Sequence, residues 1–163
     1  MHPSVTRQLV DQMDDMSKTI FAQAIGTRKE DIADISWDIA RLHAADGGMG
    51  VYFLEDRVDS AYVASTIGAL EVMIDKVPEL RIIVDDQLLE EETNGSFNLD
   101  CADKSYEHIP QTLKELLESI SELKDKGVQI DKEPLTLKRL MDIPADKHKH
   151  LQAFLSDQLR KPC

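Results

Sequence analysis

Apolar residues recur along this chain at steps of three and four, which is the repeat of an amphipathic α-helix. The clearest case is the segment 4–24, where the steps are 4, 4, 3, 4 and 4. Its stripe consists of Val5, Leu9, Met13, Met16, Ile20 and Ala24. A second stripe, within residues 109–126, consists of Leu113, Leu116, Leu117, Ile120 and Leu123. This repeat predicts an all-α fold.

Further segments extend the same prediction. Gly26 is suited to end the first helix, and Thr27 with Glu30 fits a capping box that starts a second helix running to about His43. The segment 54–76 is apolar on two sides, so it is expected to meet other helices on both and to form the centre of the fold. The remaining predicted helices are 79–92, with Pro78 in its first turn, 133–141 and 145–160. Together these segments predict an irregular bundle of about six or seven helices.

A glycine-rich stretch interrupts the helical pattern. Residues 46–50 contain Gly47, Gly48 and Gly50, and three glycines so close together disfavour a helix interior. We expect a turn here, followed by a short extended piece at 51–53. The predicted core around it comprises Trp37, Tyr62, Ile67 and Leu70.

The polar sequence Thr-Asn-Gly-Ser at residues 93–96 marks the best linker candidate. It predicts a helical core region at 1–92, a linker or loop at 93–108, and C-terminal helices at 109–163. Those helices either pack on the core or are loosely attached to it.

The chain is acidic, with a net charge of −12 over 163 residues. The acidity is concentrated in residues 51–100, which carry 12 acidic and 3 basic side chains. Such a surface disfavours nucleic acid, because neutralising phosphates requires positive charge. Residues 132–163 are more basic, and Lys147, Lys149, Arg160 and Lys161 could make weak phosphate contacts in a larger assembly, although a solvated helix face is the favoured interpretation.

Other compositional features place the protein in a broad class. The two cysteines, Cys101 and Cys163, are too few for a disulfide framework and lack neighbours at metal-ligand spacing. We therefore expect a reducing, intracellular location, cytoplasmic or nuclear. No signal peptide and no apolar run of membrane-spanning length is recognisable, so no membrane partner is expected.

The candidate catalytic groups fail on spacing. Asp85 and Asp86 follow an apolar run, as in two-metal polymerase hairpins, but their surroundings predict a helix. His148 and His150 point about 200° apart on a helix and cannot chelate one ion together. Residues 90–92 form an acidic run that fits a solvated helix face. The sequence thus predicts no catalytic, cofactor-binding or metal-binding residue and no cofactor.

One long stretch resembles a known family. The residues concerned are Met13-Asp14-Asp15, Ile25-Gly26, Ile35-Ser36-Trp37, Ala40-Arg41-Leu42-His43, Gly47-Gly48-Met49-Gly50-Val51, Ser60-Ala61-Tyr62-Val63-Ala64-Ser65 and Leu151-Gln152-Ala153-Phe154-Leu155-Ser156. In this order they resemble the segment after the catalytic domain in reverse-transcriptase-like proteins of non-LTR retrotransposons. The chain departs from the family pattern at Met49, Val51 and His43, where Leu, Leu and Pro are usual.

The resemblance covers about half of the chain and implies a non-catalytic role. The family's metal-binding aspartates lie upstream of the resembling segment, so no catalytic residue can be carried over. The glycines would form a structural turn, and the expected partner is the remainder of a polymerase. Nucleic acid would bind weakly if at all.

Two functional hypotheses therefore stand beside each other. The first is a non-catalytic helical module or remnant of a retroelement reverse transcriptase. The alternative is an unrelated helical module that binds another helical protein, and exposure of the stripe from Leu113 to Leu123 would favour it. A small hydrolase or metal-dependent enzyme would need a pocket with convergent carboxylates around Asp85 and Asp86.

Overall fold

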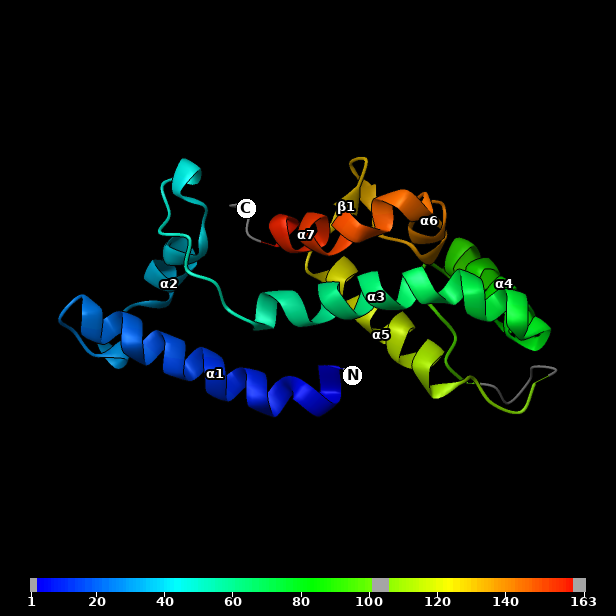
Figure 1. Ribbon diagram of the computed structural model, residues 1–163, viewed down its shortest axis with the longest axis horizontal. Helices are drawn as coiled ribbons and strands as arrows, with labels where there is room; N and C mark the ends of the chain where they lie inside the picture. The colour runs from blue at the N-terminus through cyan, green and yellow to red at the C-terminus, as the bar shows by residue number, and fades with distance from the viewer. Residues whose placement is uncertain (1–2, 101–105, 160–163) are drawn as a thin grey trace.

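The computed structural model describes residues 3–100 and 106–159 of the chain. Within them the protein is an irregular bundle of seven α-helices with one short β-hairpin, which confirms the predicted all-α fold (Figure 1). The elements in chain order are α1 (Pro3–Ala24), η1 (Lys29–Asp31), α2 (Asp34–Arg41), η2 (Ala44–Asp46), α3 (Glu55–Lys76), α4 (Pro78–Asn94), α5 (Gln111–Asp125), β1 (Gln129–Ile130), β2 (Glu133–Pro134), α6 (Leu137–Met141), η3 (Ala145–Lys147) and α7 (His148–Gln158).

Helix α3 is the centre of the fold, as predicted. It contacts α1, α4, α5, α6 and α7, and Figure 1 shows it running through the middle of the molecule. Its residues Val63, Ile67 and Leu70 are buried against the stripe of α5. All five members of that α5 stripe are at most 3% exposed. Burial of these two facing apolar stripes contributes to the hydrophobic stabilisation of the fold, together with the packing of α7 on α3.

Residues 3–54 form a unit of their own, which we call the arm. In Figure 1, α1 starts beside α3 and α5 and extends away from them, and α2 lies near its far end. The arm has its own small aromatic cluster, in which the Trp37 ring lies 5.5 Å from Phe21 and 6.1 Å from Phe53, centroid to centroid. We call the described residues from Glu55 onward the body.

The predicted second helix is wrong in its extent. The structure has a 3-10 turn at η1 and a shorter helix, α2, with an extended backbone at Ile32 and Ala33 between them. The capping box of Thr27 and Glu30 does not form, because Arg28 and Ala33 are the residues preceding the two elements. The break allows α2 to turn its one aromatic residue toward α1.

The predicted helix at 133–141 is also only partly correct. Its first two residues are strand β2, which pairs antiparallel with β1 through Gln129 opposite Pro134. The connecting residues Asp131 and Lys132 have positive φ angles of 54° and 68°, as a two-residue hairpin requires. Neither turn residue is the glycine that usually marks such a hairpin, so the sequence pattern did not predict it. Helix α6 starts later, where the Thr136 hydroxyl accepts a hydrogen bond from the Arg139 amide at 3.2 Å.

The apolar stripe of α1 does not face the body. Its members Val5, Leu9, Met13, Met16 and Ile20 are between 46% and 69% exposed. The side that contacts α3 carries Val10 and Asp14 instead. Of the two apolar sides predicted for α3, one is partly exposed, because Ser65, Ala69 and Val72 lie on it and are exposed. Of the two long helices α1 and α3, only α3 therefore contributes a predicted apolar side to the body core.

The segment predicted as a linker begins inside α4, which continues to Asn94. The buried side chain of Gln87, within α4, holds the chain that follows the helix. It donates to the Asn98 carbonyl at 2.7 Å and accepts from the Asn98 amide at 3.1 Å. The helices after residue 109 pack on α3 and share its core. Among the described residues, no helix combines the length and apolar character needed to cross a bilayer.

Candidate functional site

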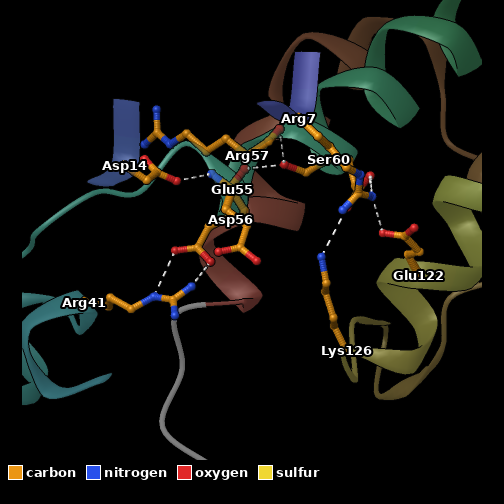
Figure 2. Close-up of polar contacts among 11 residues, drawn as sticks. Arg7, Asp14, Arg41, Glu55, Asp56, Arg57, Ser60, Glu122 and Lys126 are labelled. Atoms are coloured by element: carbon orange, nitrogen blue, oxygen red, sulfur yellow. Dashed lines mark hydrogen bonds and ion pairs between the residues drawn. The ribbon is translucent and has the colours of Figure 1, made fainter. Parts of the chain in front are cut away.

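Polar side chains converge at the N-terminal end of α3, where the arm joins the body (Figure 2). Asp14 of α1 reaches the first turn of α3, and its carboxylate accepts hydrogen bonds from the backbone amides of Leu54 at 2.7 Å and Glu55 at 2.9 Å. The first amides of a helix have no partner within the helix, and a negative charge there is favoured by the helix dipole. Asp14 therefore caps a helix that lies 40 residues further along the chain.

A second contact joins α2 to the same end of α3. The Arg41 guanidinium donates two hydrogen bonds to the largely buried Asp56 carboxylate. Burial would lower the pKa of Arg41, but the hydrogen bond and charge of Asp56 outweigh it, so the pKa is raised. The guanidinium of Arg57 stacks on the Tyr52 ring 4.3 Å from its centroid. Each of these contacts connects the arm to α3.

The third contact is an ion-pair network around Asp59, whose side chain is only 4% exposed. Its carboxylate lies 3.1 Å from the Lys126 ammonium and 3.5 Å from the Arg7 guanidinium. Arg7 also donates to Glu122 at 2.6 Å. Two carboxylates thus share two cations that come from α1 and from the residue after α5.

The two carboxyl groups of this network have opposite pKa shifts. Burial raises the pKa of Asp59, and the attraction of Lys126 and Arg7 offsets this only in part. Burial is also the largest single influence on Glu122 and would raise its pKa, but the hydrogen bond and charge of Arg7, together with Asp59 and Lys126, outweigh it, so the pKa of Glu122 is lowered. Since Glu122 is the more solvated partner, it keeps its charge more easily than Asp59 does.

The arrangement fits a structural junction better than a reactive centre. The carboxylates of Asp14, Asp56, Asp59 and Glu122 all accept hydrogen bonds from an amide or a cation. Within residues 3–100 and 106–159, no group of three or more His, Cys, Asp and Glu side chains is placed to hold a metal ion. The chemistry available here is helix capping and charge pairing.

The sequence contained a signal for these residues that the helix analysis missed. Asp59 precedes Val63 and Ile67 by one and two helical steps of four, so it is in line with the buried stripe of α3. Asp14 similarly follows Val10 by four residues. A charged residue in line with an apolar stripe indicates a buried charge with a partner. The partner residue is far away in the sequence, so this pattern does not identify it.

The other candidate feature is the exposed face of α1. At 3.6 residues per turn, the stripe from Val5 to Ile20 occupies one side of the helix, and the charged residues of α1 lie on the other sides. The polar positions beside the stripe are uncharged: Gln12, Ser17, Thr19 and Gln23. In a chain in which 31% of residues are charged, an apolar face without charge is a conspicuous surface.

The glycines at 47, 48 and 50 form the predicted tight turn. Gly47 and Gly50 have φ angles of 82° and 66°, a conformation that other residues rarely adopt. A Cβ atom on Gly48 would lie 2.2 Å from the Leu42 carbonyl oxygen. The Gly48 and Gly50 amides donate to the His43 and Leu42 carbonyls at 3.0 and 2.9 Å. The turn folds residues 50–53 back against the end of α2.

The other predicted residues are distributed over the molecule. Ile67 and Leu70 lie in the body core, Trp37 is buried in the arm, and Tyr62 is half-buried with its hydroxyl 3.3 Å from Glu115. Lys147 and Lys149 are exposed. Lys147 borders a shallow hollow that also contains Lys138, Arg139 and two acidic residues, Asp131 and Asp142. Arg160 and Lys161 lie outside the described residues.

The excluded catalytic candidates remain apart in the structure. Asp85 is exposed on α4 beside apolar residues, and the His148 ring is hydrogen-bonded to the Ile143 carbonyl at 2.8 Å. The acidic run is not wholly solvated as predicted, because Glu91 is 7% exposed and accepts a hydrogen bond from the Leu137 amide at 2.9 Å. Glu91 thereby caps α6 as Asp14 caps α3.

A mainly apolar cavity of about 270 Å³ lies between α3, α4 and the start of α5. Its walls include Leu70, Met73, Leu80, Ile83, Leu113 and Leu116. Ligand sites normally combine such walls with a few placed polar groups that orient the ligand. This cavity has few such polar groups on its walls.

Comparison with known proteins adds no further assignment, because no protein-family model, no curated protein and no solved structure matches the chain.

Proposed function

We propose that this chain is a non-catalytic helical module that binds another protein through the exposed face of α1. The observation that carries the proposal is the row of exposed apolar side chains from Val5 to Ile20, flanked by uncharged residues. Exposed apolar area on a long helix is costly in water, and covering it with a complementary surface is favourable. Helix-face recognition of this kind uses anchors spaced by three and four residues.

The surface differs from the one that the sequence suggested for this role. The stripe from Leu113 to Leu123 is covered by the body, so it is not available to a partner. The α1 stripe takes its place, since it is also helically spaced and its side chains are between 46% and 69% exposed. The junction at Asp14, Asp56 and Asp59 supports the role by fixing the arm to the body.

Photo-crosslinking in cells that express the chain tests this function. A photoreactive residue replaces Met16 on the α1 face or, as the control, Ile82, an apolar residue on α4 of similar exposure. We expect protein adducts from position 16 that Ile20→Glu abolishes, since a buried unpaired charge would disfavour binding. Equal adduct yields from both positions would refute the proposal.

A second candidate function rests on the resemblance of residues 5–75 and 148–160 to reverse-transcriptase-like proteins. The observation that favours it is the Gly-Gly-Met-Gly turn, because its backbone geometry demands glycine at the positions that the resemblance depends on. In that reading the α1 face would pack on the remainder of a polymerase. An in-frame aromatic-Ala-Asp-Asp motif encoded upstream of Met1 would support it, and an unrelated upstream sequence would refute it.

A further inference from the structure

The exposed face of α1 is complementary to itself. Leu9, Met13, Met16 and Ile20 follow one another at steps of 4, 3 and 4, which is the spacing of a coiled-coil seam. The pattern reads the same from both ends about a point between residues 14 and 15. Reversing the helix there places Leu9 opposite Ile20, and Met13 opposite Met16.

We propose that two copies of this chain associate through α1, packed antiparallel about a two-fold axis between residues 14 and 15. This inference rests on the proposed function and names the partner as a second copy. An interface of this symmetry uses the same patch on both subunits, and the patch must be complementary to itself. The α1 face meets this condition in spacing and in side-chain type.

Charge does not oppose this partner at the seam. Each copy carries a net charge of −12, so association through charged surfaces would be opposed. The α1 seam avoids this opposition because its flanks at Gln12, Ser17, Thr19 and Gln23 are uncharged. For the same reason, a basic partner would find no acidic group to pair with on this face.

Charge also selects the antiparallel direction. Figure 1 shows that the body lies beside the N-terminal part of α1, whereas the other end of α1 extends away from it. A parallel pair would therefore place two acidic bodies at one end of the seam. An antiparallel pair separates them to opposite ends, which lowers their mutual repulsion.

The size of the seam sets the expected strength. At roughly 100 Å² per side chain, burying Val5 and the four seam residues removes on the order of 500 Å² per copy, below the about 800 Å² of a standard interface. The association should therefore be reversible. We expect a dissociation constant in the micromolar range.

Sedimentation velocity of the purified chain, from about 1 µM to about 300 µM, tests the association. We expect a concentration-dependent shift from monomer to dimer, retained in Ile82→Glu and lost in Ile20→Glu, with unchanged far-UV circular dichroism in both variants. A wild-type chain that stays monomeric throughout this range would overturn the inference. So would a dimer that Ile20→Glu leaves intact.

Disulfide trapping tests the direction, in a background where Cys101 and Cys163 are replaced by serine. The antiparallel register predicts that Leu9→Cys with Ile20→Cys forms covalent dimers on oxidation, whereas Leu9→Cys alone does not, since the two Leu9 positions lie about 16 Å apart along the seam. Efficient trapping by Leu9→Cys alone would indicate a parallel pair and overturn the proposed register.

The photo-crosslinking experiment separates this inference from the proposed function. An adduct from Met16 with twice the mass of the chain supports the second copy as partner. An adduct of a different mass that Ile20→Glu abolishes overturns the self-association but retains the protein-binding function. Adducts no more abundant than those from Ile82 overturn both.

Discussion

Buried carboxylates connect the helices of this protein to one another. Asp14 and Glu91 each accept backbone amide hydrogen bonds at the start of a distant helix, and Asp59 pairs with two cations. Individual residues of this kind are where sequence reading is weakest. Helical spacing placed Asp59 and Asp14 in line with buried positions, but their partners lie on elements whose packing only the folded chain defines.

Glu91 gives a pH-dependent prediction. Burial raises its pKa above 4.5, although hydrogen bonds from the Leu137 and Lys138 amides and the charge of Lys124 oppose the shift. A raised pKa means that the folded state holds the proton more tightly than the unfolded state, so stability falls as pH rises through the interval between the two values. The Glu91→Gln variant lacks this loss.

The measurement is chemical unfolding of wild type and Glu91→Gln at several pH values. We expect the free energy of unfolding of the variant, relative to wild type, to increase as pH rises above 4.5 and to be constant in more acidic solution. Glu91→Ala is the comparison, because it removes the acceptor for the Leu137 amide and should cost about 1.5–3 kcal/mol. A difference between glutamine and wild type that does not vary with pH would contradict the prediction.

The glycine turn gives a prediction of steric origin. In Gly48→Ala the new methyl group would lie 2.2 Å from the Leu42 carbonyl oxygen, so the backbone must shift. We expect a loss of about 1–3 kcal/mol in arm stability. The matched control is Gly68→Ala within α3, where the nearest atom is 3.7 Å away and helix propensity should add about 0.5–1 kcal/mol. Thermal melts of the two variants should therefore shift in opposite directions.

At the scale of elements, the two clearest stripes of the sequence have different fates. The stripe of α5 is buried against α3, whereas the stripe of α1, which is also helically periodic, is exposed. Periodicity predicts that a helix forms, and for α1, α3, α4 and α5 the predicted ends agree with the structure to within two residues. It does not specify what covers the apolar side, because that depends on tertiary packing or on a partner.

The attachment of α1 yields the element-scale prediction. Removing the Asp14 carboxylate by Asp14→Ala leaves the Leu54 and Glu55 amides without their cap, which should cost about 1–2 kcal/mol. The exposed Asp11, on the same helix, is the control, and Asp11→Ala should change stability by less than about 0.5 kcal/mol. Hydrogen exchange should accelerate along α1 in the first variant only. Equal exchange in the two variants would show that the cap does not hold α1 in place.

At the scale of the whole molecule, the described part of the chain contains a large hydrophobic core and a smaller aromatic cluster. The body core draws on α3, α4, α5, α6 and α7, whereas the arm buries little more than the aromatic cluster around Trp37. The arm contacts the body mainly through the polar junction at the start of α3. A unit with few buried apolar contacts opens at a lower free energy than the main core does.

Trp37 is the one tryptophan of the chain, so its fluorescence reports on the arm alone, while far-UV circular dichroism is dominated by the helices of the body. We therefore expect the fluorescence transition to occur at lower denaturant concentration than the circular dichroism transition, contrary to two-state behaviour. Weakening the junction with Asp56→Asn, which removes the charge that pairs with Arg41, should shift the fluorescence midpoint further and leave the main dichroism transition nearly unchanged. Superimposable transitions in both proteins would mean that the polar contacts couple arm and body into one cooperative unit, and the arm would then be as stable as the core that supports it.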